Sequence, residues 1–183
     1  MKRALPLVLL ALGSGAAGFL LYVALVGNRP PSVDGLPPLP AAPQAAEFAP
    51  AFVLPDLDGT PRSSSEWDGT IRVVNFWATW CPPCIREIPL LVEIQEEYAD
   101  QGVQVLGIAI DETEAVVDFA ADFAFNYPVL VGQEDAMDLG NRFLNGFIGL
   151  PFTAFTDRSG RILRVHSGEI HREQIVAILA DLL

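Results

Sequence analysis

The chain has 183 residues, 51% of them hydrophobic, which is enough for one ordinary domain with a real core and an appendage. Its net charge is −12, and after residue 28 nine arginines face 23 acidic residues, a net −14, which argues against nucleic acid as a partner. Two cysteines in so long a chain do not make a disulfide-dense scaffold, so we expect their role to be local.

A long uncharged segment comes first. Residues 4–27 carry no charge, and at about 1.5 Å per residue they can cross a hydrocarbon core of about 30 Å. Lys2 and Arg3 precede this segment, so the positive-inside tendency keeps the N-terminus in the cytoplasm and exports the remainder. A cleaved signal peptide is the alternative, but its apolar region usually has about 7–15 residues. We therefore expect a signal-anchor transmembrane helix within residues 1–27.

A proline- and alanine-rich segment follows over residues 28–47. Its repeated prolines remove backbone donors and fix φ, so neither a helix nor a strand ladder is expected there. We interpret it as an extended, semi-rigid linker, with a proline-rich ligand for a partner as the functional alternative. The folded domain is expected over residues 48–183.

The first half of this domain has the pattern of a βαβ unit. Residues 72–78 and 103–110 are short, nearly apolar runs, which is typical of central strands covered on both faces. Between them, a helix is predicted to end near Gly102. Its apolar face is expected to comprise Ile85, Ile88, Leu91, Val92, Ile94 and Tyr98. The two strands should then be parallel and joined by a right-handed crossover.

The second half continues the alternation. We expect a helix over about 112–124, a strand near 127–131 and a short helix around 135–144. Residues 151–157 and 161–167 flank a turn and predict an antiparallel hairpin, and an amphipathic helix closes the chain. The fold class is therefore α/β, with a mixed, mainly parallel sheet between helices.

Both cysteines lie in one CPPC motif, directly after the first central strand. At the first turn of a helix, unpaired N–H groups and the helix dipole stabilise a thiolate, so Cys81 is the expected nucleophile. Cys84, one turn later, is close enough to attack the resulting mixed disulfide and release the product. Pro82 and Pro83 suit the first helical turn and are expected to stiffen the ring between the cysteines.

Two other roles for the cysteine pair are less consistent with the sequence. A permanent structural disulfide with only two residues between its cysteines would restrict the unfolded chain little. A zinc site would need His166 and His171, which are predicted at the end of a strand and the start of a helix, far from the cysteines. We therefore assign the chain a redox-active pair, no metal and no organic cofactor.

Together, these motifs resemble the thioredoxin superfamily, and within it the membrane-anchored, exported thiol–disulfide oxidoreductases of the TlpA/ResA type. The resemblance covers roughly residues 48–183 and is carried by FAPAFVLPDLDGT, VVNFWATWCPPC and GLPFTAFTDRSGRI. It implies a thioredoxin-like fold in which Pro89 kinks the first helix and Pro151 is cis and faces the cysteines. It also implies a substrate-binding groove, for which we expect contributions from Trp80, Pro82, Pro83, Leu150 and Pro151.

Two departures from the family pattern bear on proton transfer and on substrate. Thioredoxins have a buried Asp, the proton acceptor for the second cysteine, where this chain has Asn75, and Asn cannot take that proton. The TlpA/ResA branch has a Glu that Glu112 matches, so we hypothesise that Glu112 has a raised pKa and assists proton transfer at Cys84. The alternative is that Glu112 only complements a helix dipole. Leu150 and Phe152 flank Pro151, unlike the residues in branches dedicated to cytochrome c maturation.

The resemblance implies an enzyme of the bacterial inner membrane, with its catalytic domain on the periplasmic side. It would reduce disulfides of exported proteins, for example in cytochrome c maturation or copper-site assembly, with electrons from a transmembrane partner of the CcdA or DsbD type. Two alternatives stay open. One is a redoxin-type thiol peroxidase, although ATWCPPC lacks the Thr-x-x-Cys arrangement of that group. The other is a copper metallochaperone that uses both thiols as ligands.

Overall fold

The computed structural model describes residues 44–147 and 149–183. No helix within these residues is long and apolar enough to cross a bilayer. The predicted anchor over residues 1–27 and the linker up to residue 43 lie outside the described part of the chain.

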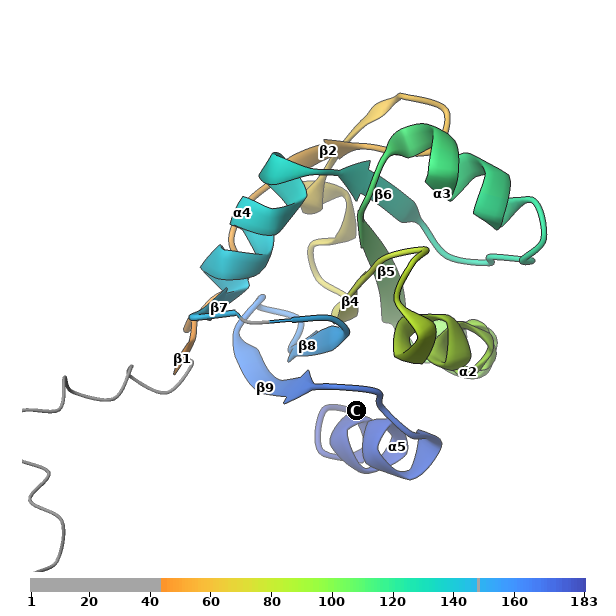
Figure 1. Cartoon of the computed structure of the whole chain (residues 1–183). Helices are drawn as coiled ribbons and strands as arrows, with labels where there is room; N and C mark the ends of the chain where they lie inside the picture. The colour runs from red at the N-terminus through yellow and green to blue at the C-terminus, as the bar shows by residue number, and fades with distance from the viewer. Residues whose placement is uncertain (1–43, 148) are drawn as a thin grey trace, which may run out of the picture. The chain divides into compact units, whose positions relative to one another are not determined.

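A five-stranded sheet in the order β6-β5-β4-β8-β9 forms the centre of the domain (Figure 1). The central strands β4 (Ile71–Trp77) and β5 (Val103–Ile110) lie within one residue of their predicted bounds. β4 and β5 are parallel, as are β5 and β6 (Val129–Gly132). β8 (Phe152–Thr156) runs antiparallel to both β4 and β9 (Ile162–Ser167). The mixed sheet, the βαβ unit and the C-terminal hairpin are thereby confirmed.

Helices cover both faces of this sheet. α2 (Pro82–Tyr98) and α5 (Arg172–Ala180) lie on one side, and α4 (Glu134–Phe143) lies on the other (Figure 1). α3 (Thr113–Ala120) is shorter than the helix predicted over 112–124. A 3-10 turn follows α2, and Gly102 then ends the helical segment at φ 82°, a left-handed conformation that suits glycine.

The apolar runs of β4 and β5 supply two separate cores because successive side chains of a strand point to opposite faces. Val73 and Trp77 belong to the cluster on the side of α2 and α5, whereas Val74 and Phe76 belong to the cluster on the side of α4. Phe76 stacks on Phe152 with ring centroids 4.3 Å apart. Burial of each such ring contributes about 1.5–3 kcal/mol. This pair therefore helps to fix the start of β8 beside the end of β4.

The buried face of α2 differs from the predicted one. Ile88, Leu91 and Ile94 are buried as expected, but Ile85, Val92 and Tyr98 are only half-buried. Their expected places are taken by Cys84, Glu87 and Gln95. The Gln95 side chain can be buried because its Oε1 accepts a hydrogen bond of 2.7 Å from the backbone N–H of Val105.

The folded domain begins earlier than residue 48, where the sequence placed its boundary. β1 (Gln44–Ala45) pairs with β7 (Leu144–Asn145), and the Glu47 carbonyl accepts a 2.9 Å hydrogen bond from the N–H of Ile162. Residues 44–47 therefore belong to the domain rather than to the linker. Backbone pairing of this kind leaves no mark on side-chain composition. The hairpin of β2 (Val53–Pro55) and β3 (Pro61–Ser63) was likewise not predicted as strands.

Candidate active site

Cys81 and Cys84 form a disulfide at the N-terminus of α2, with their Cα atoms 5.3 Å apart. Cys81 is the N-cap residue, and Pro82 and Pro83 occupy the first two helical positions. Cys81 keeps 4% of its surface exposed, whereas Cys84 has none. Cys81 is therefore the outer of the two cysteines, placed where a helix N-terminus stabilises a thiolate.

Asp111 ties the loop that carries Cys81 to the neighbouring strand. β4 and β5 are parallel, so their carboxyl ends meet at one edge of the sheet, and Asp111 directly follows β5. Its Oδ2 accepts hydrogen bonds from the Thr79 N–H at 2.9 Å and from Thr79 Oγ1 at 2.6 Å. Its Oδ1 accepts from the Glu112 N–H at 2.9 Å. Sequence reasoning did not connect Asp111 with Thr79.

The predicted groove residues lie around the same edge of the sheet. The Leu150–Pro151 bond is cis, as the resemblance implies. Phe152 pairs with Phe76 in the register of β8 and β4, which brings Pro151 to the end of the sheet where the cysteine loop starts. Leu150 packs against the core cluster that includes both cysteines. A hollow of about 480 Å³ opens over Leu150 and Pro151.

The aromatic and proline residues beside Cys81 form an accessible rim. Trp80 is 67% exposed, a high value for so large an apolar side chain. Pro82 is exposed and Pro83 half-buried. Trp77, by contrast, is only 1% exposed and belongs to the core. The two tryptophans of the FWATWC motif therefore have different environments, and Trp80 is the one that a partner can touch.

A buried carboxyl group lies on the same helix face as Cys84. Glu87 is 1% exposed, and its Oε1 accepts a hydrogen bond of 2.6 Å from Asn75 Nδ2. Its Oε2 accepts a 3.0 Å bond from the N–H of Ile170, and Asn75 Nδ2 also donates to Thr153 Oγ1 at 3.0 Å. Burial raises the pKa of Glu87 to about 7, although the bonds from Ile170 and Asn75 oppose the shift. Glu87 thus changes its charge near neutral pH.

Sequence reasoning missed Glu87, although a signal for it exists. Glu87 follows Cys84 by three residues and precedes Leu91 by four, so helical spacing puts all three on one face. A carboxyl group on the buried stripe of a helix is costly to bury and therefore marks a candidate site.

Glu112, the carboxyl group that sequence analysis proposed as the proton partner, has a different environment. It is exposed and occupies the N-cap position of α3 without a side-chain capping bond. It lines a hollow together with Trp80, Asp111 and residues at the start of α4. Glu112 and Glu87 are therefore two distinct carboxyl groups near the cysteine pair, one accessible and one enclosed.

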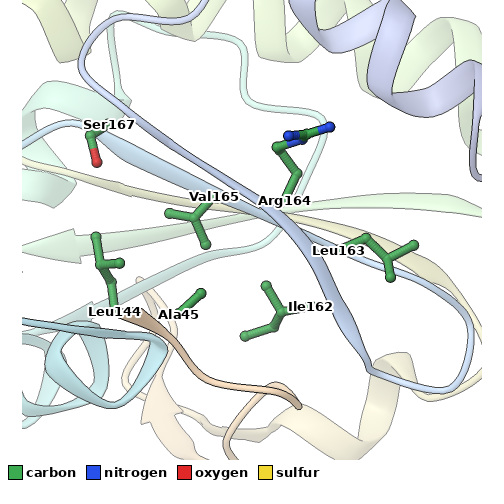
Figure 2. A pocket seen from close by; sticks show the side chains of 7 residues that line it. All are labelled: Ala45, Leu144, Ile162, Leu163, Arg164, Val165 and Ser167. Carbon is green, nitrogen blue, oxygen red and sulfur yellow. The ribbon is translucent and has the colours of Figure 1, made fainter. Parts of the chain in front are cut away.

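A third hollow, of about 380 Å³, lies between β9 and the paired strands β1 and β7. Figure 2 shows its lining, in which Arg164 points away from Ala45 and Ile162. Its lining residues include no cysteine and no carboxylate.

His166 lies on β9 and His171 at the N-cap of α5, as the sequence predicted. Within residues 44–147 and 149–183, no three His, Cys, Asp or Glu side chains form a metal-binding group.

Comparisons with known proteins agree with this geometry. The redoxin family model matches residues 44–183. The thiol-disulfide oxidoreductase ResA of Geobacillus kaustophilus is 32% identical over 178 residues, which cover 96% of this chain and 90% of that protein. ResA of Bacillus cereus is 30% identical over 171 residues, or 92% and 89% of the two chains.

Solved structures of thiol:disulfide interchange proteins also resemble this chain. A thiol:disulfide interchange protein of the thioredoxin family from Chlorobium tepidum superposes with a TM-score of 0.67 at 31% identity. The match covers 78% of this chain and 98% of that one. The redox pair at the helix N-terminus and these similarities agree on the chemistry of the chain, which belongs to the redoxin family and is a thiol–disulfide oxidoreductase.

Proposed function

We propose that this oxidoreductase is a membrane-anchored reductase of protein disulfides that works on the periplasmic side of a bacterial inner membrane. The uncharged residues 4–27 would form its anchor, with Lys2 and Arg3 on the cytoplasmic side. The similarity to the Geobacillus kaustophilus protein supports this organisation, because it covers 96% of the chain and so extends well into the N-terminal segment.

The position of Cys81 at the N-cap of α2, with the fully buried Cys84 one turn further along the helix, is the observation that carries the proposed mechanism. The thiolate of Cys81, the outer of the two cysteines, attacks a substrate disulfide and bonds to one of its sulfur atoms, while the other leaves and takes up a proton. Cys84 then loses its proton and attacks the Cys81 sulfur. The Cys81–Cys84 disulfide forms, the second substrate sulfur leaves, and two electrons have passed to the substrate.

The proton of Cys84 needs an acceptor because Cys84 is fully buried. We assign this role to Glu87, which lies one helical turn further along the same buried face. With a pKa raised to about 7 by burial, its carboxylate can accept a proton near neutral pH and return it later. Glu112, which is exposed, stays the alternative that the sequence indicated.

A reductase in this compartment depends on an external supply of electrons. Periplasmic proteins meet an oxidising environment, so a reductase there needs electrons delivered across the membrane. A partner of the CcdA or DsbD type would supply them. The substrates would be exported proteins with cysteine pairs, as in cytochrome c maturation or copper-site assembly. Trp80, Pro82, Pro83, Leu150 and Pro151 would line the groove in which the substrate backbone docks.

Trapping the mixed disulfide tests this function. The full-length Cys84→Ser variant, expressed in the native host, should accumulate substrates and the electron donor linked to Cys81, and mass spectrometry identifies them. The Cys81→Ser/Cys84→Ser variant is the control and should trap nothing. Absence of any adduct on Cys84→Ser would contradict the proposal. Peroxide-dependent turnover, or stoichiometric Cu(I) binding without disulfide reduction, would favour the peroxidase or the copper chaperone instead.

A further inference from the structure

A hollow of about 310 Å³ opens beside Trp80, between the end of β5 and the start of α4. We call it the Trp80–Met137 hollow. Its lining residues are Trp80, Ile110, Asp111, Glu112, Gln133, Glu134 and Met137. Trp80 directly precedes Cys81, so one wall of this hollow is the residue next to the exchanging cysteine. The proposed groove over Pro151 shares Trp80 with this hollow but none of its other lining residues, and the exchange through Cys81, Cys84 and Glu87 uses none of them.

The apolar part of this hollow is open to a partner. Trp80 is 67% exposed and Met137 is 49% exposed, and both belong to the few large apolar side chains that are exposed in the described residues. Tryptophan gives a large, rigid contact surface, and the flexible methionine side chain adapts to partners of different shape. Two such residues from separate elements, facing one hollow, indicate a surface that receives an apolar side chain.

The charged part of the hollow has a single sign. Asp111, Glu112 and Glu134 line it, and no Lys or Arg does. Asp111 is engaged with Thr79, but Glu112 and Glu134 are exposed and take part in none of the ion pairs within the described part of the chain. By contrast, on the side of α2 and α5, Arg86 and Arg172 neutralise neighbouring glutamates. The hollow therefore presents uncompensated negative charge around an apolar centre.

We propose that the Trp80–Met137 hollow docks the polypeptide segment next to the partner's exchanging cysteine, and selects segments that carry an aliphatic or aromatic side chain together with Lys or Arg. The acidic rim attracts the cation, and the exposed face of Trp80 can also hold it by a cation–π contact. The inference rests on the proposed exchange at Cys81. It applies to either direction of electron flow, since both pass through the same mixed disulfide.

Three synthetic peptides with the same intramolecular cystine test the selection. They carry Leu with two Lys, Leu with two Glu, or Ser with two Lys beside one cysteine. The reduced full-length protein is mixed with each peptide, and acid quenching with mass spectrometry gives the second-order rate constant. At low ionic strength the Lys peptide should react about tenfold faster than the Glu peptide. In 1 M salt, where the Debye length is about 3 Å, this ratio should fall to about twofold.

The ratio of the rate constants of two peptides, measured with the same variant, reports on docking alone. A general effect of the variant on the reactivity of Cys81 changes both rate constants equally and cancels in the ratio. Glu112→Gln/Glu134→Gln should lower the Lys-to-Glu ratio to about threefold at low salt. The matched control Glu96→Gln/Glu173→Gln removes the same charge from exposed positions of α2 and α5 and should keep the tenfold ratio. Met137→Ser should lower the Leu-to-Ser ratio about fivefold and leave the charge ratio in place.

Two outcomes would overturn the inference. If the control variant lowers the Lys-to-Glu rate ratio as much as Glu112→Gln/Glu134→Gln does, the preference for Lys comes from the overall acidity of the domain. If all three peptides react at equal rates, the protein has no preference among these segments. Hydroxyethyl disulfide, which is small and neutral, separates this failure from a failure of the proposed function. If the protein reduces it but does not distinguish the peptides, only the docking inference fails; if it reduces no disulfide, the proposed function fails.

Discussion

Glu87 and Glu112 lie near the same cysteine pair in opposite environments. Glu87 is enclosed in the domain, where the side chain of Asn75 and the backbone N–H of Ile170 donate to its carboxyl group. Glu112 is exposed on the outer side, beside Trp80. Desolvation brings the first into the pH range of thiol chemistry, while the second is available as surface charge. Environment, rather than residue type, is thus the basis on which we propose proton transfer for Glu87 and partner recognition for Glu112.

The environment of Glu87 also accounts for the departure from thioredoxins at Asn75. In those proteins the acidic side chain near the second cysteine comes from the strand, whereas in this chain the strand supplies an amide. Asn75 donates to Glu87 and to Thr153, so the carboxyl group near Cys84 comes from α2 instead. A neutral amide satisfies the carboxylate without a positive charge, so burial dominates and the pKa of Glu87 rises.

The largest effect expected from this comparison is the pH dependence of stability. The pKa of Glu87 is raised from 4.5 to about 7 in the folded protein, so the folded state holds this proton more tightly than the unfolded state. The resulting stabilisation is fully present below pH 4.5 and is lost as pH rises through 7, by about 3 kcal/mol. Denaturant unfolding of the oxidised protein between pH 4.5 and 8 measures it.

Glu87→Gln should abolish this decline. The variant will also lose stability at every pH, because its amide N–H₂ must face one of the two donors that Glu87 accepts, so the slope and not the absolute value is diagnostic. Side-chain hydrogen bonds lower the pKa values of Glu66, Asp157 and Glu169. These groups therefore make the folded state less stable as pH falls, mainly below pH 4.5, which is the opposite of the effect of Glu87. A Glu87→Gln protein that keeps the wild-type slope would contradict the environment assigned to Glu87.

An intermediate effect on unfolding free energy is expected at Asp111, which connects the loop before Cys81 with the backbone N–H of Glu112. Asp111→Ala removes the acceptor for two backbone N–H groups and the Thr79 hydroxyl, and should cost about 1–3 kcal/mol of unfolding free energy. Thr79→Ala removes only the hydroxyl contact and should cost about 1 kcal/mol or less. Guanidinium unfolding of the oxidised proteins compares them. Equal losses in both variants would show that the backbone bonds to Asp111 contribute nothing.

The smallest effect is expected at Glu112. Glu112→Gln alters an exposed side chain without a capping bond, so unfolding free energy should change by less than about 0.5 kcal/mol. The pH profile of Cys84 alkylation in the reduced protein should also keep its wild-type shape, whereas Glu87→Gln should shift it. A shift with Glu112→Gln and none with Glu87→Gln would restore Glu112 as the proton partner and reverse the comparison.

The sequence by itself determined the order of the five central-sheet strands and the four α-helices, the parallel βαβ unit and the position of the CPPC motif at a helix start. These features depend on local periodicity and on residues adjacent in the chain, so they can be read without tertiary structure. The family motifs added the cis bond before Pro151, which the structure contains.

Only the tertiary structure decided which groups surround the cysteine pair. Asn75, Thr153 and Ile170 come from parts of the chain up to 95 residues apart and meet around Glu87 only when β4, β8 and the start of the last helix pack against α2. Asp111 reaches Thr79, and Met137 reaches the hollow beside Trp80, in the same way. Burial and hydrogen bonding depend on neighbours in space, and no local pattern in the sequence specifies them.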